Sequence, residues 1–457
     1  MSATRRSFSG HEFLLMALAF LGIFVYGLLT ALPGTVLPTL ERNHFLPNDA
    51  VAGTFLLINA IGAVVAYIVS GPLTDRLGKK FSLSAGAAVV VLAMGGFAII
   101  VTRIEAAAAL GLIFACSLML GLGANAIVSA GHALVGDIAS AWRNAALNLL
   151  DVCFGLGLMT LPLIVSAFQQ GANLSGIFWA LAAAAGVLLI LVLAPRFPPP
   201  THPESFPLRE AKDLFANASF WMLAIGLFMY VGAEVSVGKW VVNFMQRDAR
   251  LLASAGVDAA QLANMARASN DALSRFFEHD PAGVSVANYA LGTLSLFGLS
   301  LIIGRLLSSL LLGVARVNSL ILLTLGGALM TIGLGVAFTA SSLSAVRWAV
   351  FASGIGMGPI FPTSVGLASV IVPRIAGTAM SWVMGIGFAG LLVIPPAVGY
   401  ISNAVGGESG DVRKGLSAVF TASVVMLLLH IVLTMRGRGR LGETEADVEV
   451  EATAEAK

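Results

Sequence analysis

Twelve long apolar segments are the strongest constraint on what this 457-residue chain can fold into. A helix needs about 20 mostly apolar residues to cross the hydrocarbon core of a bilayer. Segments of this kind lie near residues 12–40, 51–72, 81–102, 106–135, 143–168 and 175–195, and then near 219–245, 286–313, 318–339, 343–371, 376–402 and 413–435. The pattern predicts an all-α membrane protein with twelve transmembrane helices in two sets of six.

Composition excludes the soluble alternatives. The chain is 58% hydrophobic and only 11% charged, whereas a soluble domain is roughly a quarter charged because its surface faces water. A net charge of +2 gives no argument for nucleic acid. The sequence contains no phosphate-binding loop, zinc-ligand cluster or nucleophile elbow, so we expect no enzyme activity, no cofactor and no metal. Cys116 and Cys153 lie in apolar runs and are expected to be small core residues.

The spacing of the segments predicts the domain organisation. We expect an N-terminal six-helix bundle over 1–195, a cytoplasmic linker rich in proline and charge over 196–218, and a C-terminal bundle over 219–436. An acidic tail over 437–457 is expected to be disordered. An outer loop over 246–287 contains a helical pattern that starts near Asp258 and ends at Asp280-Pro281. This helix is either a lid over an outward opening or a surface helix packed on the protein or on lipid headgroups.

Lysine and arginine residues predict the orientation. With a cytoplasmic N-terminus, fourteen of them fall in cytoplasmic segments and nine on the opposite face. The excess favours both termini in the cytoplasm. Arg5 and Arg6 precede an apolar run that ends near Leu40 without a small-residue cleavage site, so we expect a first membrane helix that is retained.

The most specific motif connects the second and third spans. It runs Gly71-Pro-Leu-Thr-Asp-Arg-Leu-Gly-Lys-Lys80. Gly71 and Gly78 allow close helix approach and a tight turn, and Asp75 can accept hydrogen bonds from a helix N-terminus and pair with an arginine. The basic residues of the motif, Arg76, Lys79 and Lys80, are expected to face the anionic cytoplasmic leaflet.

This motif, in this loop of a six-plus-six chain, resembles the signature of the major facilitator superfamily. The resemblance covers about residues 10–436 and implies two pseudo-symmetric six-helix bundles, a central cavity and alternating access. It also implies that the aspartate matching Asp75 helps to latch the cytoplasmic side. We therefore expect a monomer in a bacterial-type inner membrane, whose partners are the lipid bilayer, protons and a small-molecule substrate.

Ionisable residues inside predicted spans are candidates for function, since a charge at the bilayer centre costs about 2.5–3.5 kcal/mol on insertion scales. Glu234 lies about fifteen residues into the seventh span, near mid-bilayer. Removing a carboxyl from water favours its protonated form, which suits a proton carrier. The alternative is a structural Glu234 paired with Arg305 or Lys239. Lys239 lies nearer the outer end of the span, where it can extend to the interface.

Two further ionisable residues have open alternatives. Arg305 in the eighth span either binds substrate hydroxyls or a carboxylate, or extends from the helix end to the interface. Asp151 lies about 12 Å along the fifth span from Arg143, inside the hydrocarbon. Asp151 is a second candidate for proton coupling, and the alternative is a structural partner for His132 of the fourth span or for a helix terminus.

Neutral polar and aromatic residues in span interiors are candidates for substrate binding. Aromatic faces stack on the apolar side of a sugar ring and amides bind its hydroxyls, although each residue could instead hold helices together. These candidates are Tyr26, Asn59, Asn125, Asn148, Trp240, Asn288 and Trp382. Because no large set of fixed charges accompanies them, a neutral substrate is more natural than a dianion or trianion.

A narrower resemblance concerns the substrate. The segments Tyr230–Trp240, Ala146–Gly157, Gly304–Leu307 and Gly358–Thr363 are similar to the fucose-permease type of proton–sugar symporter. This resemblance implies proton-coupled uptake of a hexose or a similar small polyol. Fucose permease carries acidic residues in its first and fourth spans, and this sequence has none there. Coupling must therefore move to Glu234 or Asp151, or the protein is a facilitator.

Two other functional classes remain open. One is a proton-driven exporter of amphipathic compounds, although the fifth span lacks the closing glycines of the G-x-x-x-G-P-x-x-G-G run found in drug antiporters. The other is a non-transporting receptor on a transporter fold.

Overall fold

The computed structural model confirms an all-α protein. It describes residues 9–139, 143–167, 174–198, 211–258, 270–371, 376–407 and 410–437. The acidic tail, most of the predicted linker and the middle of the predicted outer loop lie outside these residues. In the described part of the chain, twelve helical segments are long and apolar enough to cross a membrane, and no strand is present.

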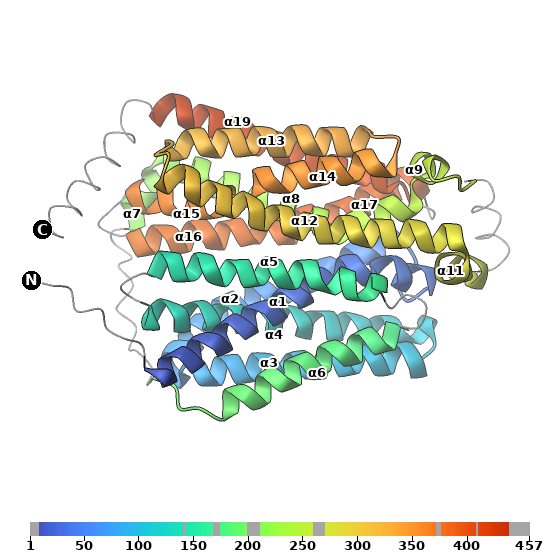
Figure 1. Ribbon diagram of the computed structural model, residues 1–457, viewed down its shortest axis with the longest axis horizontal. Coiled ribbons are helices and arrows are strands. Elements are labelled where there is room, and N and C mark those ends of the chain that lie inside the picture. Colours follow the sequence, from blue (N-terminus) through green and yellow to red (C-terminus); the bar gives the residue numbers. More distant parts are fainter. Residues whose placement is uncertain are drawn as a thin grey trace, which may run out of the picture. The chain divides into compact units, whose positions relative to one another are not determined.

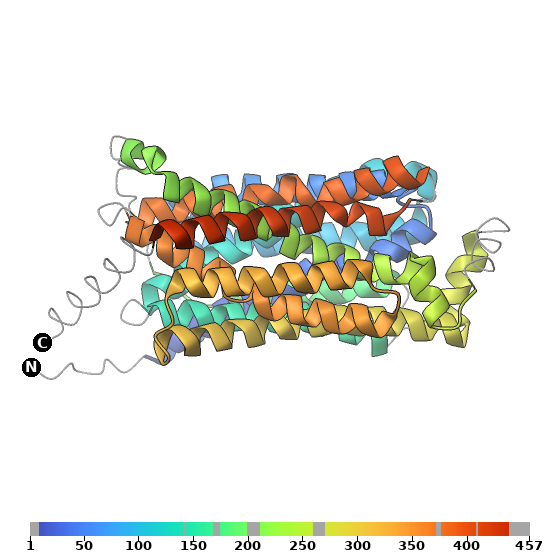
Figure 2. The same cartoon turned by 90° about the horizontal axis from the view of Figure 1, so that it is seen from above.

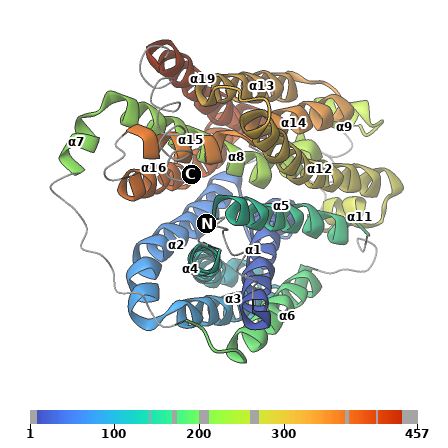
Figure 3. The ribbon, with the colours of Figure 1, turned by 60° about the vertical axis from the view of Figure 1, so that its left-hand side comes forward.

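The first six helices follow the first six predicted spans. They are α1 (Gly10–Arg42), α2 (Asp49–Leu77), α3 (Lys79–Arg103), α4 (Ala106–Ile138), α5 (Arg143–Ala167) and α6 (Leu174–Leu193). Short connections between consecutive helices favour antiparallel neighbours. Helix α3 packs along α4, which follows it in the chain, and also along the more distant α6, as Figures 1 and 3 show.

The second half contains more and shorter helices. It comprises α7 (Ala211–Ala216), α8 (Ala218–Arg247), α9 (Ala249–Ser254), α11 (Asn270–His279), α12 (Pro281–Gly313), α13 (Ser319–Thr339), α14 (Leu343–Met357), α15 (Ile360–Ile371), α16 (Ala376–Ala389), the 3₁₀ helix η3 (Gly390–Leu392), α17 (Ile394–Gly406), α18 (Val412–Gly415) and α19 (Ser417–Gly437). Helix α8 packs against α12, α16 and α19, and α13 packs against α14 and α19 (Figures 1 and 2).

Two predicted spans are interrupted. The tenth is divided into α14 and α15 at Gly358-Pro359, and the eleventh into α16, η3 and α17 before Pro395-Pro396. Proline lacks the backbone N–H that continues a helix, and its ring clashes with the preceding turn. Continuous hydropathy across both segments hides these breaks.

The chain divides into two compact units by its contacts. Unit 1 contains residues 1–36 and 58–204, and unit 2 contains residues 37–57 and 205–457. The end of α1 and the beginning of α2 therefore belong to unit 2, together with the second half of the chain. The predicted division into bundles over 1–195 and 219–436 stays a prediction.

Glycine pairs allow close helix contacts within each unit. In unit 1, a Cβ added to Gly27 of α1 or Gly157 of α5 would collide with the backbone of the facing helix. In unit 2, Gly53 of α2 and Gly399 of α17 form a similar contact. Small residues of this kind are typical of helix packing in membranes. The second pair brings the beginning of α2 directly against α17.

Candidate functional site

A polar cluster in unit 1 gathers several of the predicted residues. The hydroxyl of Tyr26 on α1 donates to Oδ1 of Asn125 on α4 at 3.4 Å, and the Asn125 amide donates to the carbonyl of Gly121 at 2.8 Å. The Tyr26 ring contacts that of Phe154 on α5, with centroids 5.5 Å apart. Three helices thus contribute to one polar site.

Tyr67 of α2 is a member of this cluster that the sequence analysis missed. It lies close enough to interact with both Tyr26 and Asp151. Its position inside the second span, four residues before Gly71, could have marked it as a candidate polar residue. We define the unit 1 polar cluster as Tyr26, Tyr67, Asn125, His132 and Asp151.

His132 and Asp151 form the ionisable part of the unit 1 polar cluster. Nε2 of His132 on α4 lies 3.4 Å from Oδ1 of Asp151 on α5, and the two side chains are 37% and 25% exposed. Nδ1 of His132 contacts the carbonyl of Val128 at 2.8 Å. The structure thus forms the His132–Asp151 pair, one of the two predicted alternatives for Asp151. The pair is only half-buried.

The position of one proton follows from this geometry. A carbonyl oxygen only accepts, so Nδ1 of His132 must carry hydrogen and donate to Val128. In the neutral ring Nε2 is then a bare acceptor, and it faces a carboxylate oxygen of Asp151, which is also an acceptor. One further proton on either group turns this repulsive contact into a hydrogen bond. The pair is therefore built to hold a proton.

The Gly71–Lys80 motif has the predicted turn. Gly78, between α2 and α3, has a φ of 88°, which favours glycine. The prediction that all its basic residues face headgroups is wrong for Lys79, which is 5% exposed and forms an ion pair with Asp137 of α4. A neighbouring carboxylate offsets the cost of burying this lysine. Lys80 donates to the carbonyls of Leu193 and Pro195 at 2.7 and 2.9 Å.

Some predicted residues of unit 1 have other surroundings. Gly71 lies within α2 and Arg76 is exposed. The side chains of Asp75 and Asn148 fall outside the described residues, so their predicted roles stay predictions. Asn59 of α2 donates to the carbonyl of Ser117 on α4 at 3.1 Å, a contact that holds two helices together.

Two tryptophans among the predicted residues of unit 2 pack inside that unit. Trp240 of α8 is fully buried, and its indole N–H donates to the carbonyl of Pro395 at 2.9 Å. Trp382 of α16 is 39% exposed and packs edge-on against Phe215 of α7, with centroids 5.1 Å apart. The half-buried residues are Glu234 of α8 and Asn288 and Arg305 of α12. Their roles in binding and coupling stay predictions.

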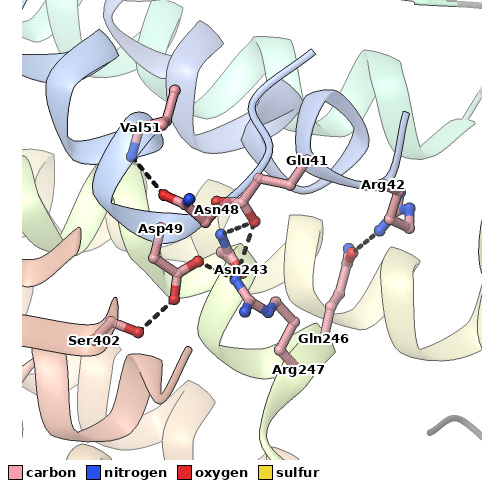
Figure 4. A network of polar contacts seen from close by, with 9 residues as sticks. All are labelled: Glu41, Arg42, Asn48, Asp49, Val51, Asn243, Gln246, Arg247 and Ser402. Atoms are coloured by element: carbon pink, nitrogen blue, oxygen red, sulfur yellow. Dashed lines mark hydrogen bonds and ion pairs between the residues drawn. The ribbon is translucent and has the colours of Figure 1, made fainter. Parts of the chain in front are cut away.

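A charged network at the end of α8 was not predicted from the sequence (Figure 4). Arg247 contacts two carboxylates, Glu41 at the end of α1, at 3.1 Å, and Asp49 at the start of α2. Asn243 donates to Glu41 at 2.7 Å, and the hydroxyl of Ser402 on α17 donates to Asp49. We call these five residues the α8 network. It ties the segment 37–57 to α8 and α17 within unit 2.

Two further arginines extend this polar region. Arg42 donates to Gln246 at 2.6 Å and lies over the Phe277 ring of α11, 4.9 Å from its centroid. Arg413 contacts Asp248 through two nitrogens, at 2.5 and 2.8 Å. Both lie at the ends of predicted spans, and both are held by other side chains of unit 2. The acidic residues beside the predicted span ends were the signal that charge counting overlooked.

Comparison with known proteins decides the family. The sequence profile described as Major Facilitator Superfamily matches residues 19–316, more than half of the chain. The chain belongs to this superfamily. Its twelve candidate spans and the glycine turn between α2 and α3 agree with that assignment.

One curated relative and several solved structures are similar to this superfamily member. Bypass of stop codon protein 6 of Saccharomyces cerevisiae is 22% identical over 417 residues, which cover 84% of this chain and 76% of that protein. Its name describes no transport activity.

The solved structures resemble the chain in fold. A D-xylose–proton symporter has a TM-score of 0.68 at 14% identity and covers 93% of this chain and 97% of its own. A mutant of the nucleoside transporter NupG has a TM-score of 0.70 at 14% identity, covering 93% and 100%. The E. coli fucose:proton symporter has a TM-score of 0.60 at 14% identity, covering 93% and 99%. At these identities the likeness shows the transporter fold and no substrate.

Proposed function

We propose that the protein is a secondary transporter that takes up a hexose or a similar small polyol together with a proton, by alternating access. The observation that supports this proposal best is the His132–Asp151 pair, because one proton on either group allows a hydrogen bond between them. The transporter fold and the sugar symporters among the similar structures support the substrate class. The location is a bacterial-type inner membrane with both termini in the cytoplasm.

Asp151 is the better of the two predicted coupling acids. Its imidazole neighbour can accept and return a proton, and both side chains remain partly accessible. Tyr26, Tyr67 and Asn125 add hydroxyl and amide groups nearby, which suit the hydroxyls of a polyol. Binding of substrate and of a proton in one cluster allows each to influence the other.

Counterflow tests transport without assuming an ion gradient. Proteoliposomes are loaded with unlabelled glucose, fucose, galactose or mannose, and entry of the matching labelled sugar is followed. Exchange of one sugar supports the proposal. Binding of lipophilic cations without sugar exchange would support the exporter instead, and sugar binding without exchange would support a receptor.

Asp151→Asn then tests the coupling. We expect this variant to keep counterflow and to lose accumulation driven by a proton gradient, because the amide cannot carry the proton. Glu105→Gln, which changes an exposed acid before α4, is the matched control and should behave as wild type. Undiminished accumulation by Asp151→Asn refutes its role, and Glu234→Gln in the same assay tests the remaining acid.

A further inference from the structure

Lys239 on α8 is a buried cation that has no partner among the residues the structure describes. It is only 5% exposed and lies within the seventh candidate span. It makes no hydrogen bond or ion pair with any described residue. The predicted alternative of a Glu234–Lys239 pair is therefore not formed. At 5% exposed, Lys239 is also less accessible than a lysine that extends into the interface.

Other buried polar side chains on the same face of α8 have hydrogen-bond partners. Asn243 and Gln246 lie one and two turns beyond Lys239, on the same face of the helix. Both are buried, at 0% and 4% exposed. Asn243 is bound to Glu41 and Gln246 to Arg42. Lys239 is the member of this stripe without a partner.

The helix around Lys239 offers no negative charge either. The positions three and four residues away toward the start of α8 are Ser236 and Val235, and those toward the end are Val242 and Asn243. The Ser236 hydroxyl donates to the carbonyl of Gly232 at 2.6 Å, and the Asn243 amide is used by Glu41. On the adjoining face, Gly238 is nearest to the ring of Phe297 on α12. An acceptor for the ammonium must come from outside these residues.

Two other cationic side chains, one buried and one half-buried, have acidic partners. Lys79 is paired with Asp137 in unit 1, and Arg413 with Asp248 in unit 2. A buried charge is costly unless it is paired and hydrogen-bonded. An unpaired buried cation in a transporter is therefore best explained as one half of an ion pair whose other half is the cargo.

We propose that Lys239 binds the carboxylate of a monoanionic substrate, so that the polyol of the proposed function is a sugar acid. This inference rests on the proposed function and narrows its substrate class. The ammonium is a compact charge with three donors and can bind one carboxylate. A dianion or trianion would leave negative charge unbalanced in apolar surroundings.

Counterflow with a matched pair of sugars tests the inference. Proteoliposomes holding the full chain are loaded with glucuronate or with glucose, and entry of the labelled compound is measured. We expect wild type to exchange glucuronate at a half-saturating concentration at least tenfold below that for glucose. Lys239→Met should raise that concentration for glucuronate at least tenfold and leave glucose unchanged. Lys239→Arg, which keeps the charge, should remain close to wild type.

Lys414→Met is the control for loss of a positive charge. Lys414 is exposed on α18 in the same unit, and its removal should change neither exchange. If Lys239→Met does not fold, Lys239→Gln takes its place, since it also removes the charge.

The outcomes separate this inference from the proposed function. Exchange of glucose but not glucuronate by wild type, or unchanged glucuronate exchange by Lys239→Met, overturns the role of Lys239 and leaves the transporter standing. Exchange of neither this pair nor the four neutral hexoses overturns the proposed sugar class and the inference with it.

Thermal unfolding in detergent gives a second readout that needs no transport. Glucuronate should raise the unfolding temperature of wild type and not that of Lys239→Met, because a ligand that binds only the folded state stabilises it. An equal rise of the wild-type unfolding temperature with sodium chloride at the same concentration would show that Lys239 binds any small anion, and would contradict the proposal.

Discussion

Arg247 and Lys239 are two cations of α8 that differ in whether an acidic side chain is paired with them. They are eight residues apart, about 12 Å along the helix. Arg247 contacts Glu41 and Asp49, while Lys239 contacts no acid among the described residues. A charge in an apolar span therefore has two explanations. A charge that the chain itself balances supports the fold, and a charge that it leaves unbalanced points to a ligand.

Replacing Arg247 should have the largest effect on stability. Arg247→Met leaves the carboxylates of Glu41 and Asp49 together without their cation, and Asp49 is 1% exposed. Removing one partner of a buried ion pair costs about 3–5 kcal/mol. We expect a fall of that size in the unfolding free energy, measured by denaturant unfolding in detergent and followed by circular dichroism.

Arg250→Met is the control for this measurement. Arg250 lies three residues beyond Arg247 and is exposed, so its loss should leave the unfolding free energy within about 0.5 kcal/mol of wild type. A similar small change in Arg247→Met would show that the α8 network does not stabilise unit 2.

A smaller effect is expected from Ser402→Ala in the same network. The change removes the hydroxyl that donates to Asp49 and leaves the ion pair with Arg247 in place. Hydrogen bonds to charged groups contribute about 1.5–3 kcal/mol, so the loss should fall in that range. Ser341→Ala, at an exposed serine between α13 and α14, should have no measurable effect. Equal stability of the two variants would exclude the hydroxyl from the network's energetics.

The smallest effect on stability is expected from Lys239→Met. The change leaves no acid unpaired among the described residues and replaces a buried charge with an apolar side chain of similar length. Replacing buried charge by apolar groups is often neutral or stabilising. We expect an unfolding free energy equal to or above that of wild type in the absence of ligand. A loss as large as that of Arg247→Met would mean that Lys239 is held by the fold after all.

The unit 1 polar cluster shows how far the sequence leads toward a site. Residues Tyr26, Asn125, His132 and Asp151 were all recognisable as polar groups inside apolar spans, because such groups are costly there. Their mutual distances were not, because these distances depend on how α1, α4 and α5 pack against one another. The assignment of a proton to Nδ1 of His132 follows only from the contact of that atom with the Val128 carbonyl.

The α8 network shows why the rest was missed. Glu41 and Asp49 lie at the ends of spans, where an acidic residue is ordinarily solvated and does not indicate a function. In a hydropathy pattern, such residues only mark where an apolar span begins or ends. Packing of α2 against α17 through Gly53 and Gly399 brings both acids onto Arg247, and no local pattern encodes that contact.

The sequence by itself determined the twelve spans, the all-α class and the superfamily, because each depends on local hydropathy, length or a contiguous motif. It also identified His132, Asp151 and Lys239 as ionisable groups inside the spans. Only the tertiary structure decided which of them are paired, since pairing depends on how helices from distant parts of the chain face each other. That is why Lys79 and Arg413 proved to be balanced by acids, and why Lys239 proved to have no partner among the described residues.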